Sequence, residues 1–271
     1  MSNKNRGVAV VTGAAAGIGH ATAKALQSAG YRVFGTSRKA AAESIPGIAM
    51  LTCDVTNGES VAKMVAEVMK RAGRIDVLVN NAGSGLIGGA EESSIEQAQA
   101  LFDVNVFGVL RVTNEVLPIM RSQGSGRIVN ISSVVGFIPS PFSALYTSTK
   151  HAVEGYSETL DHEVRSFGIR VLLVEPAFTR TAFELNGAQP DRMLSVYDKV
   201  RTTTNAVWNS AIQAGDAPEV VADAVVAAAT AKTPKLRYPA SKRARQLHFL
   251  RRFVPANAFD KSLRKQMRLS V

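Results

Sequence analysis

Short apolar segments alternate with longer amphipathic segments through most of this sequence, and this alternation limits the fold more than any other feature. The apolar segments are rich in valine, isoleucine and leucine, as in residues 8–12. A strand that is apolar at every position, instead of at alternate ones, is typical of a parallel sheet covered by helices on both faces. We therefore predict strands at residues 8–12, 32–36, 48–52, 76–79, 127–131, 170–174 and 236–238.

The amphipathic segments between these strands repeat apolar residues at helical spacing. They predict helices at residues 18–29, 58–72, 95–122, 144–167, 180–214 and 218–231. Strands and helices that alternate in this way form a parallel doubly wound α/β sheet, here of about seven strands flanked by helices. A chain of 271 residues without a linker or an internal repeat is near the upper limit for one core, so we predict a single domain over residues 1–271.

A glycine-rich turn, Thr12-Gly13-Ala14-Ala15-Ala16-Gly17-Ile18-Gly19, joins the first predicted strand to the first predicted helix. Glycine lets the backbone approach a pyrophosphate, and the helix N-terminus offers unpaired N–H groups to the anion. The spacing G-x-x-x-G-x-G differs from the usual G-x-G-x-x-G, and a simple tight turn is the alternative interpretation. The candidate dinucleotide-binding residues of this turn are Gly13, Ala15, Ala16, Gly17, Ile18 and Gly19.

The end of the second predicted strand indicates which dinucleotide fits. An enzyme that uses NAD places an acidic residue there to bind the ribose 2′-OH, but this strand ends in Ser37 and Arg38 with no acid. A guanidinium and a hydroxyl suit a 2′-phosphate, which a carboxylate would repel. The pair therefore favours NADP(H), and a basic surface turn is the alternative.

Tyr146 and Lys150 lie one turn apart near the start of a predicted helix and so share one of its faces. A phenol has a pKa near 10, which is too high for proton exchange at neutral pH. A neighbouring ammonium stabilises the phenolate and lowers that pKa. The pair is a candidate proton donor and acceptor, although this spacing occurs by chance in many helices.

Together with Asp54, Asn80-Asn81-Ala82-Gly83, Asn105 and Ser133, these motifs resemble those of classical short-chain dehydrogenases/reductases over about residues 6–181. The resemblance implies a Rossmann-type sheet and an oxidoreductase. Tyr146 would be the general acid/base, and Lys150 would bind the nicotinamide ribose and lower the pKa of Tyr146. Ser133 would orient the reacting oxygen, and Asn105 would hold a water that links Lys150 to solvent.

The same resemblance extends the cofactor site. Asp54 would accept a hydrogen bond from the adenine amino group, Val55 would offer its backbone, and Asn81, Ala82 and Gly83 would pass along the adenosine ribose. Residues 176–181 resemble a P-G-x-x-x-T segment that holds the nicotinamide amide, with Ala177 in place of the glycine. The further cofactor-binding residues implied are Pro176, Phe178, Thr179 and Thr181, besides Tyr146 and Lys150.

Aromatic residues flank the predicted catalytic centre. Phe137, Phe142 and Phe183, with Ser133 and Tyr146, are the candidate substrate-binding residues, and such a lining favours a lipophilic carbonyl or alcohol. Family members vary the covering segment, here about residues 178–214. The C-terminal part looks similar to the hydroxysteroid and retinol dehydrogenase branch, which suggests a steroid- or retinoid-like substrate. A non-catalytic NADP(H) sensor or scaffold on the same fold is the alternative function.

Positive charge is concentrated at the C-terminus. Residues 232–271 contain twelve Lys or Arg and one acid, whereas the rest of the chain is nearly neutral. The amphipathic helices predicted in this extension could pack on the body, cover the active site or contact an anionic surface such as a membrane. Packing on the body is the interpretation we favour, and without a nucleic-acid-binding motif we expect no nucleic-acid partner.

The sequence also leads to expectations about metal binding, cellular location and oligomeric state. The four histidines have no metal-ligand spacing, so we expect no metal site. A single cysteine, Cys53, and the absence of a signal peptide favour a cytoplasmic protein. By analogy with the family, we expect a homo-oligomer, either a dimer or a tetramer.

Overall fold

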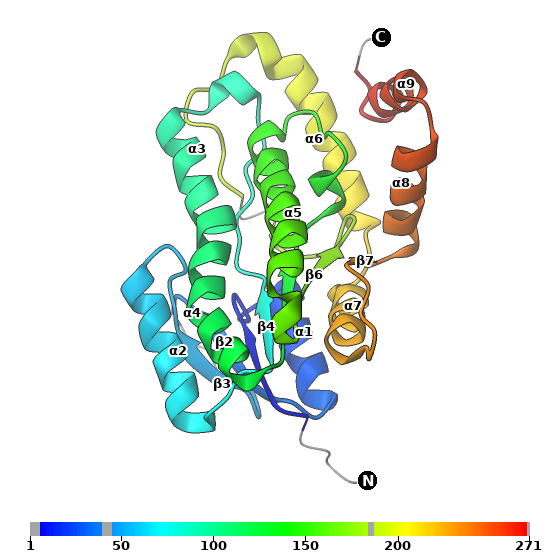
Figure 1. Ribbon diagram of the computed structural model, residues 1–271. Helices are drawn as coiled ribbons and strands as arrows, with labels where there is room; N and C mark the ends of the chain where they lie inside the picture. The colour runs from blue at the N-terminus through cyan, green and yellow to red at the C-terminus, as the bar shows by residue number, and fades with distance from the viewer. Residues whose placement is uncertain (1–5, 40–44, 184–186, 270–271) are drawn as a thin grey trace.

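A parallel sheet of seven strands forms the centre of the molecule, in the order β3-β2-β1-β4-β5-β6-β7 (Figure 1). The computed structural model describes residues 6–39, 45–183 and 187–269. Strands β1 and β4 lie side by side, and the strand order reverses between them; ligands of doubly wound sheets bind at this point. The strands are β1 (Val8–Val11), β2 (Arg32–Ser37), β3 (Ala49–Thr52), β4 (Val77–Asn80), β5 (Gly126–Ile131), β6 (Ile169–Glu175) and β7 (Arg237–Pro239).

Helices cover both faces of the sheet. One face packs against α1 (Gly17–Ser28) and α7 (Pro218–Thr230), and the other against α2 (Gly58–Ala72), α4 (Gly108–Gln123) and α5 (Ala144–Val164). Strand β1 shows the consequence for the sequence. Ala9 and Val11 pack towards α1 and α7, whereas Val8 and Val10 pack towards α2 and α4. All four side chains are buried, so the strand has to be apolar throughout.

The predicted fold class is confirmed, and each predicted strand is present with ends that differ by one residue at most. Helix α2 begins and ends where the sequence predicts. The Asn57 side chain accepts a hydrogen bond from the Ser60 N–H at 2.8 Å and caps the first turn. Gly73 ends the helix with a left-handed φ of 70°, which glycine adopts without steric strain.

The helix predicted over residues 95–122 is present but interrupted. It consists of α3 (Ile95–Phe102), a π-helical turn at Asp103–Phe107, and α4. A π turn inserts an extra residue into the helical ladder and is frequent at functional sites. Apolar periodicity does not register one inserted residue, so the sequence predicted a continuous helix.

The helix predicted over residues 180–214 is wrong in its first half. In the part of this segment that the structure describes, α6 (Asp198–Gln213) follows a short 3-10 turn at Ser195–Tyr197, and the chain before it is irregular. Pro190 lacks the N–H that a helix interior requires. Residues 184–186 lie outside the described part of the chain.

A buried ion pair holds this covering segment against the body. The fully buried Glu92 carboxylate pairs with Arg201 of α6 and accepts the Leu194 N–H at 2.8 Å. These contacts, together with the amide of Gly89, hold the pKa of Glu92 below its usual value against the opposing effect of burial. Since Glu92 lies about a hundred positions earlier in the chain, local helical preference could not reveal this arrangement.

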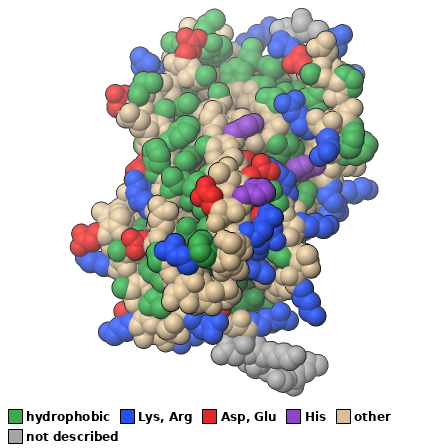
Figure 2. All heavy atoms as spheres, in the orientation of Figure 1, with side chains coloured by type: hydrophobic (Ala, Val, Ile, Leu, Met, Phe, Trp, Pro, Cys, Tyr) green, Lys and Arg blue, Asp and Glu red, His purple; other side chains and the backbone are tan. Residues whose placement is uncertain are grey.

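The C-terminal extension adds α8 (Lys242–Phe253) and α9 (Ala256–Gln266) beside β7 and the edge of the sheet (Figure 1). Lys and Arg side chains gather along this edge of the molecule (Figure 2). None of the helices in the described ranges is long and apolar enough to cross a membrane.

Candidate active site

The glycine-rich turn follows β1 at the point where the strand order reverses. Gly13 and Gly17 have positive φ angles of 66° and 54°, which side-chain-bearing residues rarely adopt. A Cβ atom on Gly19 would lie 2.1 Å from the Gly13 carbonyl oxygen, so the turn requires glycine there as well. Helix α1 then begins without a side-chain cap and without an acidic residue in its first turn. Its N-terminal amides can therefore bind a pyrophosphate, and the predicted dinucleotide fits this cradle.

The turn is held in place by the loop that follows β4. The Thr12 hydroxyl accepts hydrogen bonds from the Asn81 and Ala82 amides, each at 3.0 Å. The Asn81 side chain donates to the carbonyls of Thr12 and Gly13 at 2.9 and 3.1 Å. We predicted Asn81 along the adenosine ribose; the structure adds that its side chain braces the turn. The Asn80 side chain braces the sheet by donating to Asn130 at 2.9 Å.

The other predicted cofactor residues lie at the same edge of the sheet. Thr181 lies directly across from the glycine turn, because a Cβ atom added to Gly17 would contact the Thr181 side chain at 3.3 Å. At the β2 and β3 end, hydrogen bonds from Thr56 lower the pKa of Asp54, with a smaller contribution from the charge of Arg38. Arg38 is exposed, and Val55 is buried beneath Gly108. The Phe178 ring packs on Trp208, with centroids 5.6 Å apart, and its role toward the cofactor stays a prediction.

Helix α5 carries the predicted proton-transfer pair. Lys150 is buried, and its Nζ donates to the Ile131 carbonyl at 2.8 Å while lying 5.6 Å from the centre of the Tyr146 ring. Burial lowers the pKa of Lys150 to about 8, against the raising effect of Glu154. The ammonium therefore remains mostly charged at neutral pH, which is the charge state that its predicted role beside Tyr146 requires.

Two serines follow β5, and they differ in environment. Ser132 is buried. Its hydroxyl and the Glu154 carboxylate both lie within 3 Å of the point that a Cβ atom on Gly136 would occupy, so the two groups are close neighbours. Ser133 is partly exposed; its hydroxyl accepts the Val135 N–H at 3.3 Å and reaches the Pro176 carbonyl at 3.5 Å. The accessible hydroxyl is that of Ser133, the residue predicted to bind the reacting oxygen.

The π turn places Asn105 beneath the active site. Its side chain accepts the Ser84 N–H at 2.8 Å and donates to the Ser84 carbonyl at 2.9 Å and to Thr149 at 3.2 Å. Asn105 thus ties the loop after β4, which includes Gly83, to the helix that carries Lys150. Its role in a water relay stays a prediction.

The three predicted substrate-binding phenylalanines pack on different aromatic neighbours, and Phe183 lies against Tyr146. The Phe183 ring lies 5.9 Å from the Tyr146 ring, and Phe142 contacts Tyr197 edge to face at 5.8 Å. Phe142 has a positive φ of 61°, a strained backbone conformation of the kind found at functional sites. Phe137 contacts His248 of α8 with ring centroids 4.0 Å apart and the rings tilted by 35°.

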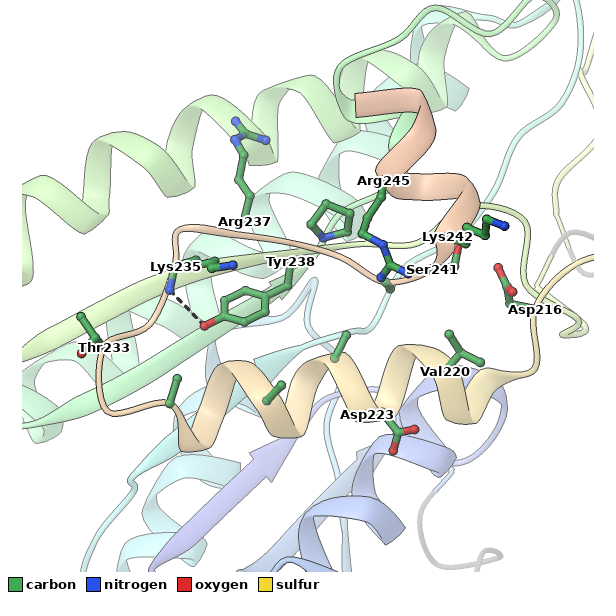
Figure 3. A pocket seen from close by; sticks show the side chains of 15 residues that line it. Asp216, Val220, Asp223, Thr233, Lys235, Arg237, Tyr238, Ser241, Lys242 and Arg245 are labelled. Carbon is green, nitrogen blue, oxygen red and sulfur yellow. Dashed lines mark hydrogen bonds between the residues drawn. The ribbon is translucent and has the colours of Figure 1, made fainter. Parts of the chain in front are cut away.

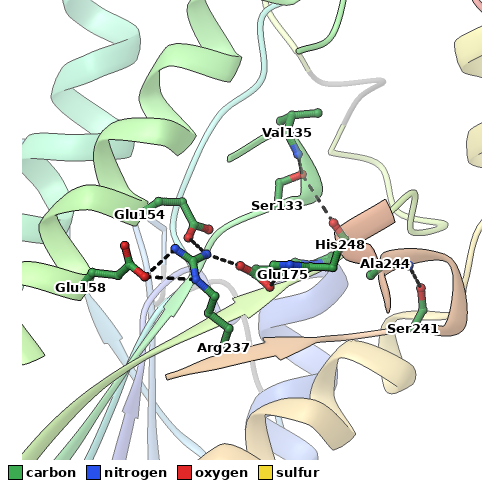
Figure 4. A network of polar contacts seen from close by, with 10 residues as sticks. Ser133, Val135, Glu154, Glu158, Glu175, Arg237, Ser241, Ala244 and His248 are labelled. Carbon is green, nitrogen blue, oxygen red and sulfur yellow. Dashed lines mark hydrogen bonds and ion pairs between the residues drawn. The ribbon is translucent and has the colours of Figure 1, made fainter. Parts of the chain in front are cut away.

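A network of charged side chains that the sequence did not reveal lies behind the site (Figure 4). Arg237 of β7 pairs with Glu154, with Glu158 at 2.9 Å and with Glu175 at 2.5 Å, and Glu175 also contacts His248 at 2.5 Å. Glu154 and Glu175 are 4% and 0% exposed. Burial and the neighbouring Glu175 raise the pKa of Glu154 to about 7, against the lowering effect of Arg237.

A cavity of about 730 Å³ lies between α7 and the connection from β7 to α8 (Figure 3). Its lining carries both signs of charge, with Asp216 and Asp223 on one hand and Lys235, Lys242 and Arg245 on the other. None of the predicted site residues lines it. Among the residues that the structure describes, there is also no group of three or more His, Cys, Asp or Glu that could hold a metal ion.

A pyrophosphate cradle at the reversal of a parallel sheet, with a serine, a tyrosine and a buried lysine beside it, defines a dinucleotide-dependent oxidoreductase. The family model for short chain dehydrogenases matches residues 7–190. The chain therefore belongs to the short-chain dehydrogenase/reductase family.

Several known proteins are similar to this chain. A 3-ketodihydrosphingosine reductase of Bacteroides thetaiotaomicron is 43% identical over 179 residues, 66% of each chain. The crystal structure of a short-chain dehydrogenase from Streptomyces avermitilis has a TM-score of 0.81 at 34% identity and covers 98% of this chain and 99% of its own. A Burkholderia phymatum relative in complex with NAD is 27% identical, covers 88% of this chain and 90% of its own, and has a TM-score of 0.75. A metagenomic one in complex with NADP is 28% identical, covers 88% and 98%, and has a TM-score of 0.68.

Proposed function

We propose that the chain is an NADP(H)-dependent enzyme that interconverts a lipophilic carbonyl compound and its alcohol. The observation that carries this proposal is the buried ammonium of Lys150, which lies one helical turn after Tyr146. The Ile131 carbonyl accepts a hydrogen bond from this ammonium and holds it in place. The dinucleotide supplies the hydride in the reductive direction and accepts it in the oxidative direction. The protein binds the substrate oxygen and transfers the proton.

Tyr146 gives its phenolic proton to the oxygen of the carbonyl as that oxygen becomes an alkoxide. Lowering the phenol pKa from about 10 to about 7 requires about 4 kcal/mol of differential stabilisation. The low-dielectric surroundings of the buried Lys150 strengthen its interaction with a phenolate. Ser133 donates a hydrogen bond to the same oxygen, which positions the carbon to receive the hydride.

Substitution of Tyr146 separates this enzyme from a non-catalytic NADP(H) sensor. We expect Tyr146→Phe to lower turnover of lipophilic ketones, aldehydes or quinones by about 100- to 10,000-fold while NADPH binding persists. Tyr156→Phe, on the same helix, is the matched control and should retain turnover. If the wild-type chain binds NADPH but oxidises it with none of these substrates, the sensor is the better interpretation.

The preference for NADP(H) rests on Ser37 and Arg38 at the end of β2. The segment Gly35-Thr36-Ser37-Arg38-Lys39 contains no acidic residue. A charge-assisted contact with a 2′-phosphate contributes about 1.5–3 kcal/mol, which corresponds to about 10- to 100-fold in affinity. Calorimetric titration of NADPH and NADH should show this ratio for the wild-type chain and for Lys39→Ala. Arg38→Ala should remove most of it. Equal affinity of the wild-type chain for both dinucleotides would refute the proposal.

The substrate class rests on the aromatic residues Phe137, Phe142 and Phe183, of which Phe183 lies against Tyr146, with a steroid- or retinoid-like compound as one candidate. Similarity to a 3-ketodihydrosphingosine reductase, whose name indicates a keto substrate, supports a carbonyl compound as well. Cys53 is buried and has no disulfide partner, which supports a reducing, cytoplasmic location. We retain the homo-oligomer as a prediction from the family.

A further inference from the structure

Helix α8 has one face against the body and one face in solvent. On the inner face, Ala244 is fully buried, Leu247 packs with it, and His248 contacts Glu175. The Arg251 side chain donates to the Phe137 carbonyl at 3.2 Å and also lies on the inner face. These contacts fix the orientation of α8, so its other face is presented to solvent by the fold and not by fraying.

The outer face of α8 consists of Arg245, Phe249, Leu250, Arg252 and Phe253. Phe249 and Phe253 are each 62% exposed, and their rings contact each other at a tilt of 43° with centroids 4.8 Å apart. Two neighbouring aromatic rings and an exposed leucine form an apolar patch on one turn of a surface helix. Clustered apolar side chains of this kind mark an interaction site more often than single exposed ones do.

Cations surround this apolar patch. Helix α8 contains five Lys or Arg and no acidic residue. The Arg252 guanidinium lies over the Phe253 ring at 5.9 Å, so charge and apolar surface belong to the same patch. Lys242 and Arg245 line the cavity between α7 and the connection from β7 to α8, so α7 does not pack against these two side chains.

We propose that the outer face of α8 binds the surface of an anionic lipid bilayer. The arginines would contact lipid phosphates and carboxylates, while Phe249 and Phe253 enter the boundary between head groups and acyl chains. At 12 residues, α8 is too short to span a bilayer, so it lies in the plane of the interface. A polyanion without hydrocarbon would match the charge of this face but not its apolar centre.

The position of α8 gives such binding a consequence for the active site. The inner face of the same helix contacts Phe137 through the His248 ring and the Arg251 side chain. A chain bound through α8 would hold Phe137, a proposed substrate-binding residue, next to the bilayer. This consequence rests on the proposed function, whereas the lipid contact itself does not.

Flotation of the full-length chain with vesicles tests the proposal. We expect binding to vesicles that combine phosphatidylcholine and phosphatidylserine, and not to phosphatidylcholine alone. Each cation near an anionic bilayer contributes about fivefold to the affinity, so Arg245→Gln with Arg252→Gln should weaken binding about 25-fold. Raising the salt concentration to about 1 M, where the screening length is about 3 Å, should have a similar effect.

The aromatic contribution is tested by Phe249→Ser with Phe253→Ser, for which we expect at least a tenfold loss of binding. Ile95→Ser removes an equally exposed apolar side chain from α3, and Lys24→Gln with Lys70→Gln removes two exposed cations from the body. Both controls should bind as the wild-type chain does.

Failure of the wild-type chain to float, or binding that is lost with the arginines but not with the phenylalanines, would overturn the proposal. Flotation requires no turnover, so its result is independent of whether the enzymatic function holds. Circular dichroism and the NADPH affinity of each variant confirm that the body remains folded.

Discussion

Glu154 provides the sharpest test of the network behind the active site. This carboxyl is 4% exposed, and its pKa is raised from 4.5 to about 7, first by burial and then by the neighbouring Glu175. We consider the substitution Glu154→Gln, which keeps the size and shape of the side chain and removes its titration.

The raised pKa makes the stability of the wild-type chain depend on pH. Between pH 4.5 and about 7 the folded chain binds more protons at Glu154 than the unfolded chain does. Its contribution to the free energy of unfolding is therefore fully present below pH 4.5 and is lost as the pH rises through 7. A shift of about 2.5 pKa units corresponds to about 3 kcal/mol, of which about 2 kcal/mol falls between about pH 5.5 and 7.5.

Urea unfolding at these two pH values, at one protein concentration and without dinucleotide, measures the difference. The free energy of unfolding of the wild-type chain should fall by about 2 kcal/mol more than that of Glu154→Gln. The matched control is Glu158→Gln, which removes a 45% exposed carboxylate from the same Arg237 and should keep the pH dependence of the wild-type chain. If Glu154→Gln and the wild-type chain had equal pH dependence, the assignment of a raised pKa to Glu154 would be refuted.

Three further substitutions probe the same region. Lys150→Met should abolish NADPH-dependent turnover yet raise the free energy of unfolding at pH 7 by up to about 3 kcal/mol, because a buried ammonium with a pKa of about 8 is removed. This gain should fade between about pH 8 and 10.5, and urea unfolding that shows no gain at pH 7 would contradict it. Gly19→Ala places a Cβ atom 2.1 Å from the Gly13 carbonyl oxygen and so distorts the glycine-rich turn. Calorimetry should detect loss of NADPH binding, and an affinity equal to that of the wild-type chain would argue against this turn as the pyrophosphate site. Arg237→Met removes the cation shared by the buried carboxylates of Glu154 and Glu175, of which Glu175 keeps its contact with His248. The substitution should cost about 3–5 kcal/mol in urea unfolding, whereas a change below about 1 kcal/mol would mean that the network is solvated.

Elements that depend on local signals were predictable from the sequence. The strands are apolar at consecutive positions because both faces of the sheet are covered, and that pattern is visible without any knowledge of partners. Helix α2 is bounded by Asn57 and Gly73, which act through their own side chain and backbone. The glycine turn is equally local, because Gly13, Gly17 and Gly19 are required by backbone geometry.

Elements fixed by distant contacts were not predictable in this way. The chain before α6 has helical periodicity, but its conformation depends on Glu92, which reaches Leu194 and Arg201 from the other side of the site. The π turn at Asn105 depends on the loop after β4, since the side chain binds both backbone groups of Ser84. In both places a tertiary contact outweighs local preference.

The buried network lies between these two cases. Tyr146, Lys150, Glu154 and Glu158 follow one another at a spacing of four, so one face of α5 was visibly polar along its length. A polar helix face is ordinarily solvated, and the sequence alone gave no reason to place it inside. What turns it inward is β7, which pairs with β6 and brings Arg237 against Glu154 and Glu175.

The C-terminal extension therefore belongs to the site and cannot be removed as an appendage. A chain that ended near Ala231 would lose Arg237 and His248 together and leave the Glu175 carboxylate buried without either partner. Such a chain would lose stability before it lost any lipid contact, because an unpaired buried charge costs several kcal/mol. The outer and inner faces of α8 can be separated only by point substitutions. Changes at Phe249 and Phe253 report on the surface, and changes at Arg237 report on the buried network with Glu154 and Glu175.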